Sequence, residues 1–276
     1  MNSLINQEKI FVLHPKTGTK TFEVMHRQYS GDWVDKSIQY EMEVTLLNNV
    51  NQNGFVYQIN RKNLLIDGSE PDIVFDQLAC ECGNALFPLK FLVNNLGEIE
   101  QIFEHQQMVE RWETIKEKLV DYYEGDTALN YIKLTDKNIK NPDVIKRMMY
   151  NHLFVYFFFK PLYGFYQDDK LNTIWKPAPF MDFTVDIPMK NTLVKKKDES
   201  NETGISNDEL YIEMESDSDV IEIKGKYTFN QKNKSIDSCE GSILMDGKEE
   251  IKLTFITKPE KSLNRLVPEP AVVNIV

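Results

Sequence analysis

The stretch NPDVIKRMMYNHLFVYFFF, from Asn141 to Phe159, decides the fold of this chain. It begins with Asn, a preferred helix cap, followed by Pro at the first helical position and Asp in the first turn. From Leu153 onward, apolar residues point in almost every direction around a helix axis instead of forming one stripe. The stretch therefore predicts a single helix that is covered on several sides, and Lys160-Pro161 is expected to end it.

The residues before this stretch have the pattern of antiparallel strands. From Ile38 to Leu46, apolar residues occupy every second position, and Phe55, Tyr57 and Ile59 repeat the pattern after the turn signal of residues 51–54. These two runs predict a hairpin. Further strands are predicted over residues 22–29, 89–93 and 98–103, with a short helix starting near Ser69 and Pro71.

Two more helices are expected between this half and the central stretch. Apolar residues at helical spacing, including Met108, Trp112 and Leu119, predict an amphipathic helix that begins after Glu104 and ends near Gly125. Asp126 is expected to cap a second, shorter helix. With the central stretch, this gives three helices.

Alternation returns after the central stretch. A strand is expected near Phe180 to Ile187, and residues 195–208 have the polar composition of a loop. At least four strands in meander order are then predicted, around residues 210–214, 221–229, 236–245 and 251–255. Three prolines follow Lys258 before an apolar C-terminus.

These patterns predict an α+β fold. Strongly curved antiparallel sheet, as one sheet or two adjacent ones, is contributed by the N- and C-terminal halves and packs around a central helical insert of three helices. The predicted parts form one composite domain. They are a strand-rich half at 1–103, a helical segment at 104–166, a β-meander half at 167–258 and a tail with an apolar terminal strand at 259–276.

Charge and composition exclude several partners. The net charge is −11 and the pI is about 5.0, so phosphate backbones are repelled and nucleic acid is not an expected partner. No window reaches the ~20 apolar residues of a membrane span. Because residues 1–9 lack the pattern of a signal peptide, we expect a cytoplasmic location.

Metal and cofactor signatures are missing from the sequence. Of three cysteines, only Cys80 and Cys82 are close together, and they lack the spacing and the second ligand pair of a zinc site. The segment Thr17 to Lys20 lacks the glycines of a phosphate-binding loop. We expect no metal site and no cofactor.

Catalytic candidates are few, and each has a simpler explanation. The carboxylate pairs fall in a turn or on the polar face of predicted strands, where solvated charge is ordinary. They are Asp168 with Asp169, Asp182 with Asp186, and Glu213 with Glu215. His105 and His152 lack a nucleophile motif nearby. We predict no catalytic residue.

The aromatic segment has two interpretations. Its rings are either core or the lining of an apolar pocket between a curved sheet and the central helix, with His152 as a polar contact. The candidate ligand-binding residues are Phe154, Phe157, Phe158, Tyr163, Tyr166 and His152.

The C-terminus supplies a candidate for partner binding. Val272, Val273 and Ile275 form an apolar, β-branched segment that either pairs within its own sheet or adds as a strand to a partner.

Together these observations favour a non-enzymatic protein-binding or assembly protein, such as an adaptor, a chaperone-like factor or a component of a larger complex. The alternative is a carrier or sensor of an apolar small molecule bound between the curved sheet and the aromatic helix. A hydrolase of unknown class that uses scattered acids and His152 is the third hypothesis.

Overall fold

A computed structural model describes residues 9–31, 33–50, 54–178, 181, 185–196, 209–219, 221–245 and 249–259. The helices are α1 (Val74–Asn84), α2 (His105–Tyr122), α3 (Asp126–Ile139), α4 (Pro142–Met149) and α5 (Leu153–Phe158). The strands are β1 (Lys9–Phe11), β2 (Gly18–Ser30), β3 (Trp33–Asn49), β4 (Phe55–Ile66), β5 (Leu89–Val93), β6 (Ile99–Phe103), β7 (Gly164–Tyr166), β8 (Lys170–Trp175), β9 (Ile187–Lys196), β10 (Glu209–Ser216), β11 (Ile221–Phe229), β12 (Ile236–Met245) and β13 (Glu249–Thr257).

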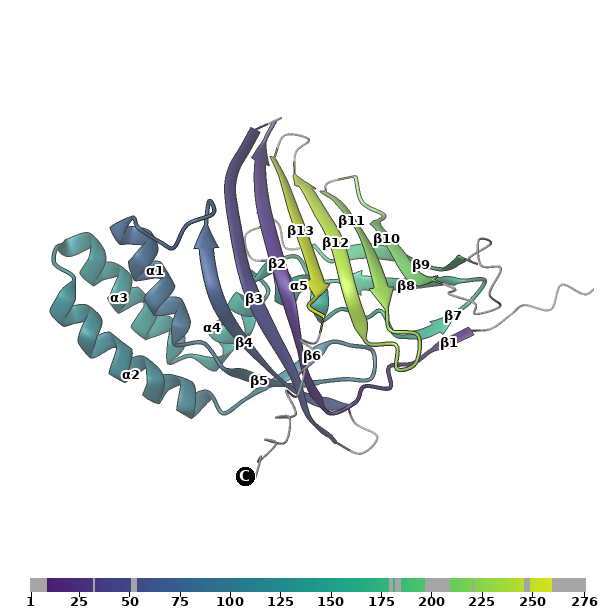
Figure 1. The fold of residues 1–276 in the computed structure, drawn as a ribbon, viewed down its shortest axis with the longest axis horizontal. Coiled ribbons are helices and arrows are strands. Elements are labelled where there is room, and N and C mark those ends of the chain that lie inside the picture. The colour runs from purple at the N-terminus through teal and green to yellow at the C-terminus, as the bar shows by residue number, and fades with distance from the viewer. Residues whose placement is uncertain are drawn as a thin grey trace, which may run out of the picture.

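One eleven-stranded antiparallel sheet organises the molecule, in the order β6-β5-β4-β3-β2-β13-β12-β11-β10-β9-β8. The two halves of the chain meet where β2 pairs with β13, with Val24 opposite Phe255 (Figure 1). Strands β1 and β7 form a separate two-stranded sheet. The predicted α+β architecture is confirmed, and the main sheet is one sheet and not two.

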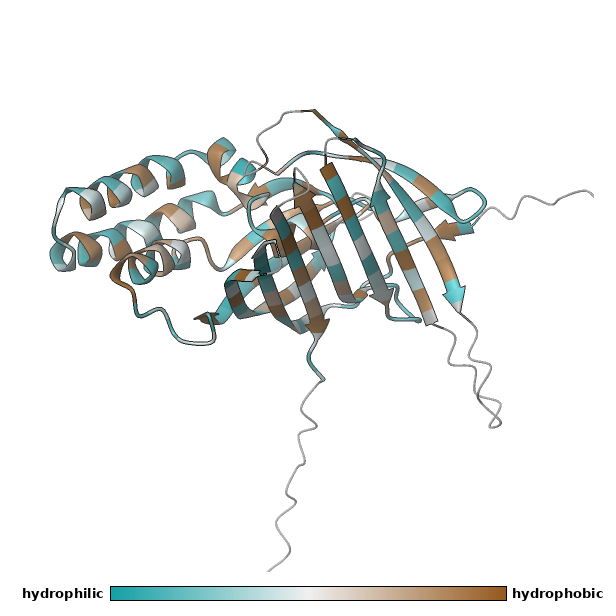
Figure 2. Cartoon of the chain, turned by 90° about the horizontal axis from the view of Figure 1, so that it is seen from above, coloured by the Kyte–Doolittle hydropathy of each residue, from teal (hydrophilic) through white to brown (hydrophobic). Residues whose placement is uncertain are grey.

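Alternation along the strands separates two faces of the sheet. In β3, Tyr40, Met42 and Val44 are buried while the residues between them are partly exposed. Figure 2 shows the same alternation of hydrophobic and hydrophilic residues along the other strands. The buried face is here called the inner face, and the opposite one the outer face. Because side chains in a strand point alternately to either side, each strand supplies both faces.

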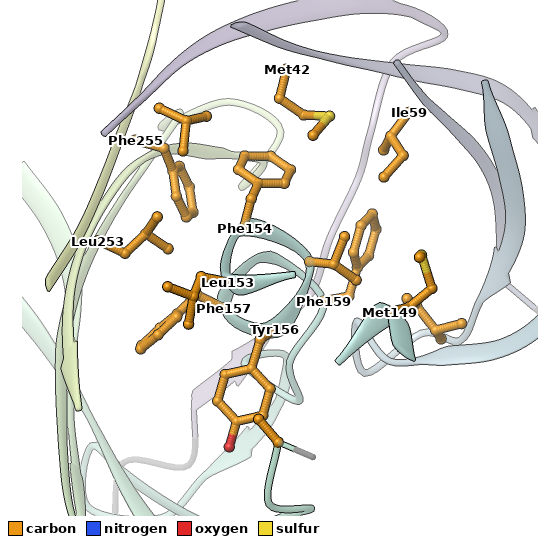
Figure 3. Packing of buried hydrophobic residues seen from close by; sticks show 14 of the residues in the cluster. Met42, Ile59, Met149, Leu153, Phe154, Tyr156, Phe157, Phe159, Leu253 and Phe255 are labelled. Atoms are coloured by element: carbon orange, nitrogen blue, oxygen red, sulfur yellow. The ribbon is translucent and has the colours of Figure 1, made fainter. Parts of the chain in front are cut away.

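The helices occupy two places. Helices α1, α2 and α3 lie together beyond β4 at one end of the molecule (Figure 1). Helix α5 lies against the inner face, and the sheet passes around it (Figure 3). No helix in the described ranges is long and apolar enough to cross a membrane.

The central stretch is not the single helix predicted from its sequence. Asn141 does cap α4 by accepting hydrogen bonds from the backbone N–H groups of Asp143 and Val144. The helix ends at Met149, and His152, in extended conformation, precedes the separate helix α5. Because of this break, the aromatic half is oriented independently of α4 and enters the concave side of the sheet.

Other boundaries also differ from the prediction. Helix α1 begins at Val74, because Ser69 exchanges backbone hydrogen bonds with Ile66 in a turn instead of capping a helix. Gly125, and not Asp126, is the cap residue of α3. Strands β7 and β8 were not predicted. Strand β9 begins only at Ile187, and residues 180 and 182–184 of the strand expected from Phe180 lie outside the described residues.

Candidate functional site

Helix α5 is fixed to the sheet by a close approach and a hydrogen bond. Gly241 of β12 faces Phe157, and a Cβ atom built on this glycine would lie 2.5 Å from Cε1 of the ring. Glycine thus leaves the room that Phe157 fills. The hydroxyl of Tyr227 on β11 donates a hydrogen bond of 2.8 Å to the Phe157 carbonyl oxygen, one of the free carbonyls at the end of the helix.

The ring of Phe154 in α5 and that of Phe159, just after the helix, also pack into the core. Phe154 points toward β13 and β3, with Phe255 at 4.9 Å between ring centroids (Figure 3). Phe159 lies 4.8 Å from the ring of Phe91 on β5. Phe154, Phe157 and Phe159 are all at most 3% exposed. Aromatic side chains contribute large buried areas in such clusters, so this part of the segment acts as core.

A small void remains at the end of α5. It has a volume of about 30 Å³, which is room for about one water molecule. Phe158 is half-buried at this place, whereas its neighbours in the helix are buried. The lining residues come from β4, β5, α5, the start of β12 and the segments that follow β1, β5 and α5. They are Leu13, Tyr57, Val93, Gly97, Phe158, Phe159, Tyr163, Ser235 and Ile236.

Two hydrogen bonds hold the turn between β11 and β12, which leads into the lining residues Ser235 and Ile236. Tyr163 donates from its hydroxyl to the Lys234 carbonyl oxygen at 3.0 Å, and the His14 backbone N–H donates to the Asn233 carbonyl oxygen at 2.9 Å. At the rim, the Lys20 ammonium lies 2.8 Å from the hydroxyl oxygen of Ser235. The void thus has an apolar lining with one cation nearby.

Only two of the six candidate ligand-binding residues line this void, namely Phe158 and Tyr163. Phe154 and Phe157 pack against the sheet, as described above. Tyr166 donates a buried hydrogen bond of 2.8 Å to the Leu162 carbonyl oxygen. His152 lies at the start of α5, where its ring contacts those of Tyr40 and Phe87.

His152 is a half-buried and neutral imidazole. Burial lowers its pKa to about 3, with a further contribution from the nearby Arg61 cation. Its Nδ1 atom is buried without a hydrogen-bond partner. The aromatic rings next to it are those of Tyr40 and Phe87.

Lys160 is the most unusual charged residue in the core. It is 4% exposed, and its Nζ atom lies 3.5 Å from the ring centroid of Tyr156 and 4.3 Å from that of Trp175. A third ring, Tyr150, is 5.7 Å away. Burial lowers the Lys160 pKa well below its usual range, and the Glu98 carboxylate opposes this shift. The aromatic faces partly replace the water that the ammonium loses.

The predicted carboxylate pairs do not converge. Asp169 pairs with Lys9 at 2.5 Å and Asp186 with Lys176 at 2.6 Å, in both cases as partly exposed ion pairs. Glu213 and Glu215 lie on the outer face. Asp182 lies outside the described residues.

The described part of the chain has neither a metal site nor a reactive thiol. No group of three or more His, Cys, Asp or Glu side chains there is arranged to hold a metal ion. The three cysteines are free, with Cys82 and Cys239 buried and Cys80 half-buried. Burial raises the pKa of the Cys82 thiol to about 11, so it is protonated at neutral pH.

Larger hollows lie elsewhere: one of about 610 Å³ lies between β4 and α1, and two lie on the outer face of the sheet. The first on the outer face, of about 550 Å³, extends from β2 to β9 and is lined by side chains such as Arg27, Lys224 and Lys252. A second, of about 540 Å³, adjoins it and shares Met25, Glu240 and Thr254 with it. Alternation along the strands predicts that these side chains share a face, but sequence alone does not show which strands are neighbours.

Comparisons with known proteins identify no family for this chain. No protein family model matches the chain, and no curated protein matches it. Among solved structures, the chain is similar to one titled "Lipid-protein interactions in lipovitellin", with a TM-score of 0.44 and 12% identity. The alignment covers 87% of this chain and 25% of the other, so this chain spans about a quarter of that protein's length.

Proposed function

We propose that this chain is a non-enzymatic binding protein for an apolar small molecule that enters where α5 meets the sheet. The proposal rests on the void beside Phe158 and Tyr163. This void is lined by apolar side chains, and the aromatic core reaches the surface there. Ligand sites are mostly apolar, with a few polar groups at the edge.

The void must open to take such a ligand. Its volume of about 30 Å³ holds no more than a methyl-sized group, so a longer molecule has to displace side chains. We expect the turn between β11 and β12 to move, since it leads into the lining residues Ser235 and Ile236 and is held to neighbouring segments by hydrogen bonds from Tyr163, His14 and Lys20.

The cation at the rim indicates the kind of apolar ligand to try first. Lys20 shares its ammonium between Asp237 at 2.7 Å and Ser235. This ion pair is partly exposed, so exchanging Asp237 for a ligand carboxylate costs little. A fatty acid combines an apolar chain with such a carboxylate.

A titration with a fluorescent fatty acid tests the proposal. Val93→Leu adds one methylene group to the lining, which fills the void, and Val120→Leu makes the same change on the exposed side of α2. We expect binding to the parent chain and to Val120→Leu, and at least tenfold weaker binding to Val93→Leu. Equal affinity in all three proteins, or no binding to any, contradicts the proposal.

A second candidate is the protein-binding role, which the two hollows on the outer face favour. The predicted partner-binding residues Val272, Val273 and Ile275 lie outside the described residues, and strand addition by this segment stays a prediction. Deleting residues 268–276 tests it. Undiminished recovery of a partner by the folded, shortened chain would rule out docking through this segment.

A further inference from the structure

A row of basic side chains crosses the outer face of the sheet from strand to strand. Strand register places Arg27 directly opposite Lys252, and Lys252 opposite Ser242, which in turn lies opposite Lys224. Glu215 follows, opposite both Lys224 and Lys190. The basic row thus consists of Arg27, Lys252, Lys224 and Lys190 on four of six consecutive strands, and it runs through the hollow of about 550 Å³.

This arrangement is unfavourable for stability by itself. Like charges directly opposite each other on neighbouring strands destabilise a sheet, and Arg27 and Lys252 are such a pair. Arg27 has no ion pair with any residue in the described ranges. Local arrangements that lower stability without a compensating structural contact are expected at functional surfaces.

The lysines of the basic row have acidic neighbours, but these pairs are weak. Lys252 is 3.0 Å from Glu250, Lys224 pairs with Glu222, and Lys190 is 4.0 Å from Glu215. Each pair is partly exposed to solvent, where an ion pair contributes at most about 1 kcal/mol. An incoming carboxylate therefore competes for these ammonium groups at small cost.

The hollow differs in charge from the rest of the protein. Its lining has five basic and three acidic side chains, whereas the whole chain has a net charge of −11. A local excess of positive charge in a concave surface attracts an anionic group even on an acidic protein.

The flanking rows limit the shape of the anionic partner. Glu250 and Glu222 lie on one side of the basic row, and Glu240 and Glu213 lie on the other, next to Lys226. A wide anionic surface such as a membrane or a nucleic-acid duplex would face these carboxylates as well. A narrow extended chain lies along the basic row and avoids most of them.

The spacing of the lysines fits an extended peptide. Neighbouring strands are about 4.8 Å apart, so Lys252, Lys224 and Lys190, each separated by one strand, recur at about 9.6 Å. An extended peptide in polyproline II conformation repeats its side-chain direction every three residues, over about 9.3 Å. Acidic residues at every third position would thus meet one lysine each.

We propose that the basic row on the outer face docks an extended acidic segment of a partner protein, with acidic side chains at about every third position. This inference goes beyond apolar-ligand binding and does not depend on it. The occupant is a polypeptide because the row is narrow, is bordered by acids and has the repeat of an extended chain.

Fluorescence anisotropy with labelled twelve-residue peptides tests the inference at low salt. One peptide carries Glu at every third position, a second carries the same residues with the Glu residues clustered at one end, and a third has Lys in place of Glu. The protein variants are Lys224→Gln/Lys252→Gln and, as a matched control, Lys118→Gln/Lys133→Gln on the exposed sides of α2 and α3. Thermal unfolding checks that all variants are folded.

We expect the spaced acidic peptide to bind the parent chain and the control variant, and to bind the row variant about tenfold or more weakly. We also expect the clustered peptide to bind more weakly and the basic peptide not to bind. Equal binding to both variants overturns the proposal, as does equal binding of the spaced and clustered peptides, or binding of anionic vesicles in preference to the peptide. Fatty-acid binding by the row variant is expected to be unchanged, which separates this outcome from a failure of the apolar site.

Discussion

Tyr227 and Phe157, seventy residues apart in the chain, are joined by a buried hydrogen bond of 2.8 Å from the tyrosine hydroxyl to the phenylalanine carbonyl oxygen. The bond satisfies a carbonyl at the C-terminal end of α5, which has no partner within so short a helix. It connects the central helix directly to the C-terminal half of the sheet.

Removing this hydroxyl is expected to destabilise the fold. Tyr227→Phe leaves the Phe157 carbonyl buried without a partner, which costs about 1–3 kcal/mol. Tyr211→Phe, one strand away on the outer face, is the matched control and should change the free energy of unfolding by less than about 0.5 kcal/mol. Urea denaturation measures both. Equal effects would mean that the bond does not hold α5.

The paired glycines Gly225 and Gly241 are expected to differ in their tolerance of alanine. A Cβ on Gly241 meets the Phe157 ring in the core, whereas one on Gly225 lies 2.7 Å from Cε of Met214, the end of a flexible side chain. We predict that Gly241→Ala costs about 1–3 kcal/mol of unfolding free energy and that Gly225→Ala costs less. Phe157→Leu should restore part of the loss in Gly241→Ala. If the two alanine variants are equally stable, Phe157 is not held by the close approach.

The architecture could be predicted well from the sequence, because the architecture depends on local patterns of residues. Alternation from Ile38 to Leu46 identified a strand and its inner face, and the cap at Asn141 identified a helix start. The break at His152 was missed, since Asn151 and His152 are compatible with either a continuous helix or a turn. Tertiary packing against the sheet decides between them.

The candidate sites were less predictable. Phe158 and Tyr163 were identified by their aromatic character, but Leu13 and Ile236 join them only through contacts between distant segments. The basic row depends on the pairing of β2 with β13, which brings Arg27 next to Lys252 across 225 positions of sequence. No local signal in either strand indicates that pairing.

Lys160 is expected to make stability depend on pH. Burial lowers its pKa in the folded protein, while the unfolded chain has an ordinary lysine pKa near 10.4. Between these two values the unfolded state binds more protons, so the penalty for burying Lys160 is relieved as pH rises toward 10. Burial raises the pKa values of Tyr150 and Tyr156, whose rings face the ammonium.

The measurement compares Lys160→Met with the parent chain. We predict that the variant gains unfolding free energy relative to the parent near pH 7, and that this gain shrinks as the pH is raised to 10. Lys133→Met, at an exposed position of α3, should show no such trend. A gain that stays constant with pH would mean that the Lys160 pKa is not lowered.

Arg27→Glu is expected to stabilise the protein. The change replaces the opposed cations Arg27 and Lys252 by an opposite-charge pair, with an expected gain of about 0.5 kcal/mol. Arg27→Gln should give about half of this gain. Thermal unfolding at low salt measures the difference. A loss of stability in Arg27→Glu would show that the basic row is not a strained arrangement.

The most direct test of apolar-ligand binding is native mass spectrometry of the chain purified from its own host. The account predicts that the parent chain and Val120→Leu retain an extra mass that organic solvent extracts, and that Val93→Leu, whose void is filled, does not. If the parent chain carries no extra mass, or Val93→Leu carries the same mass, the void beside Phe158 and Tyr163 is not a ligand site.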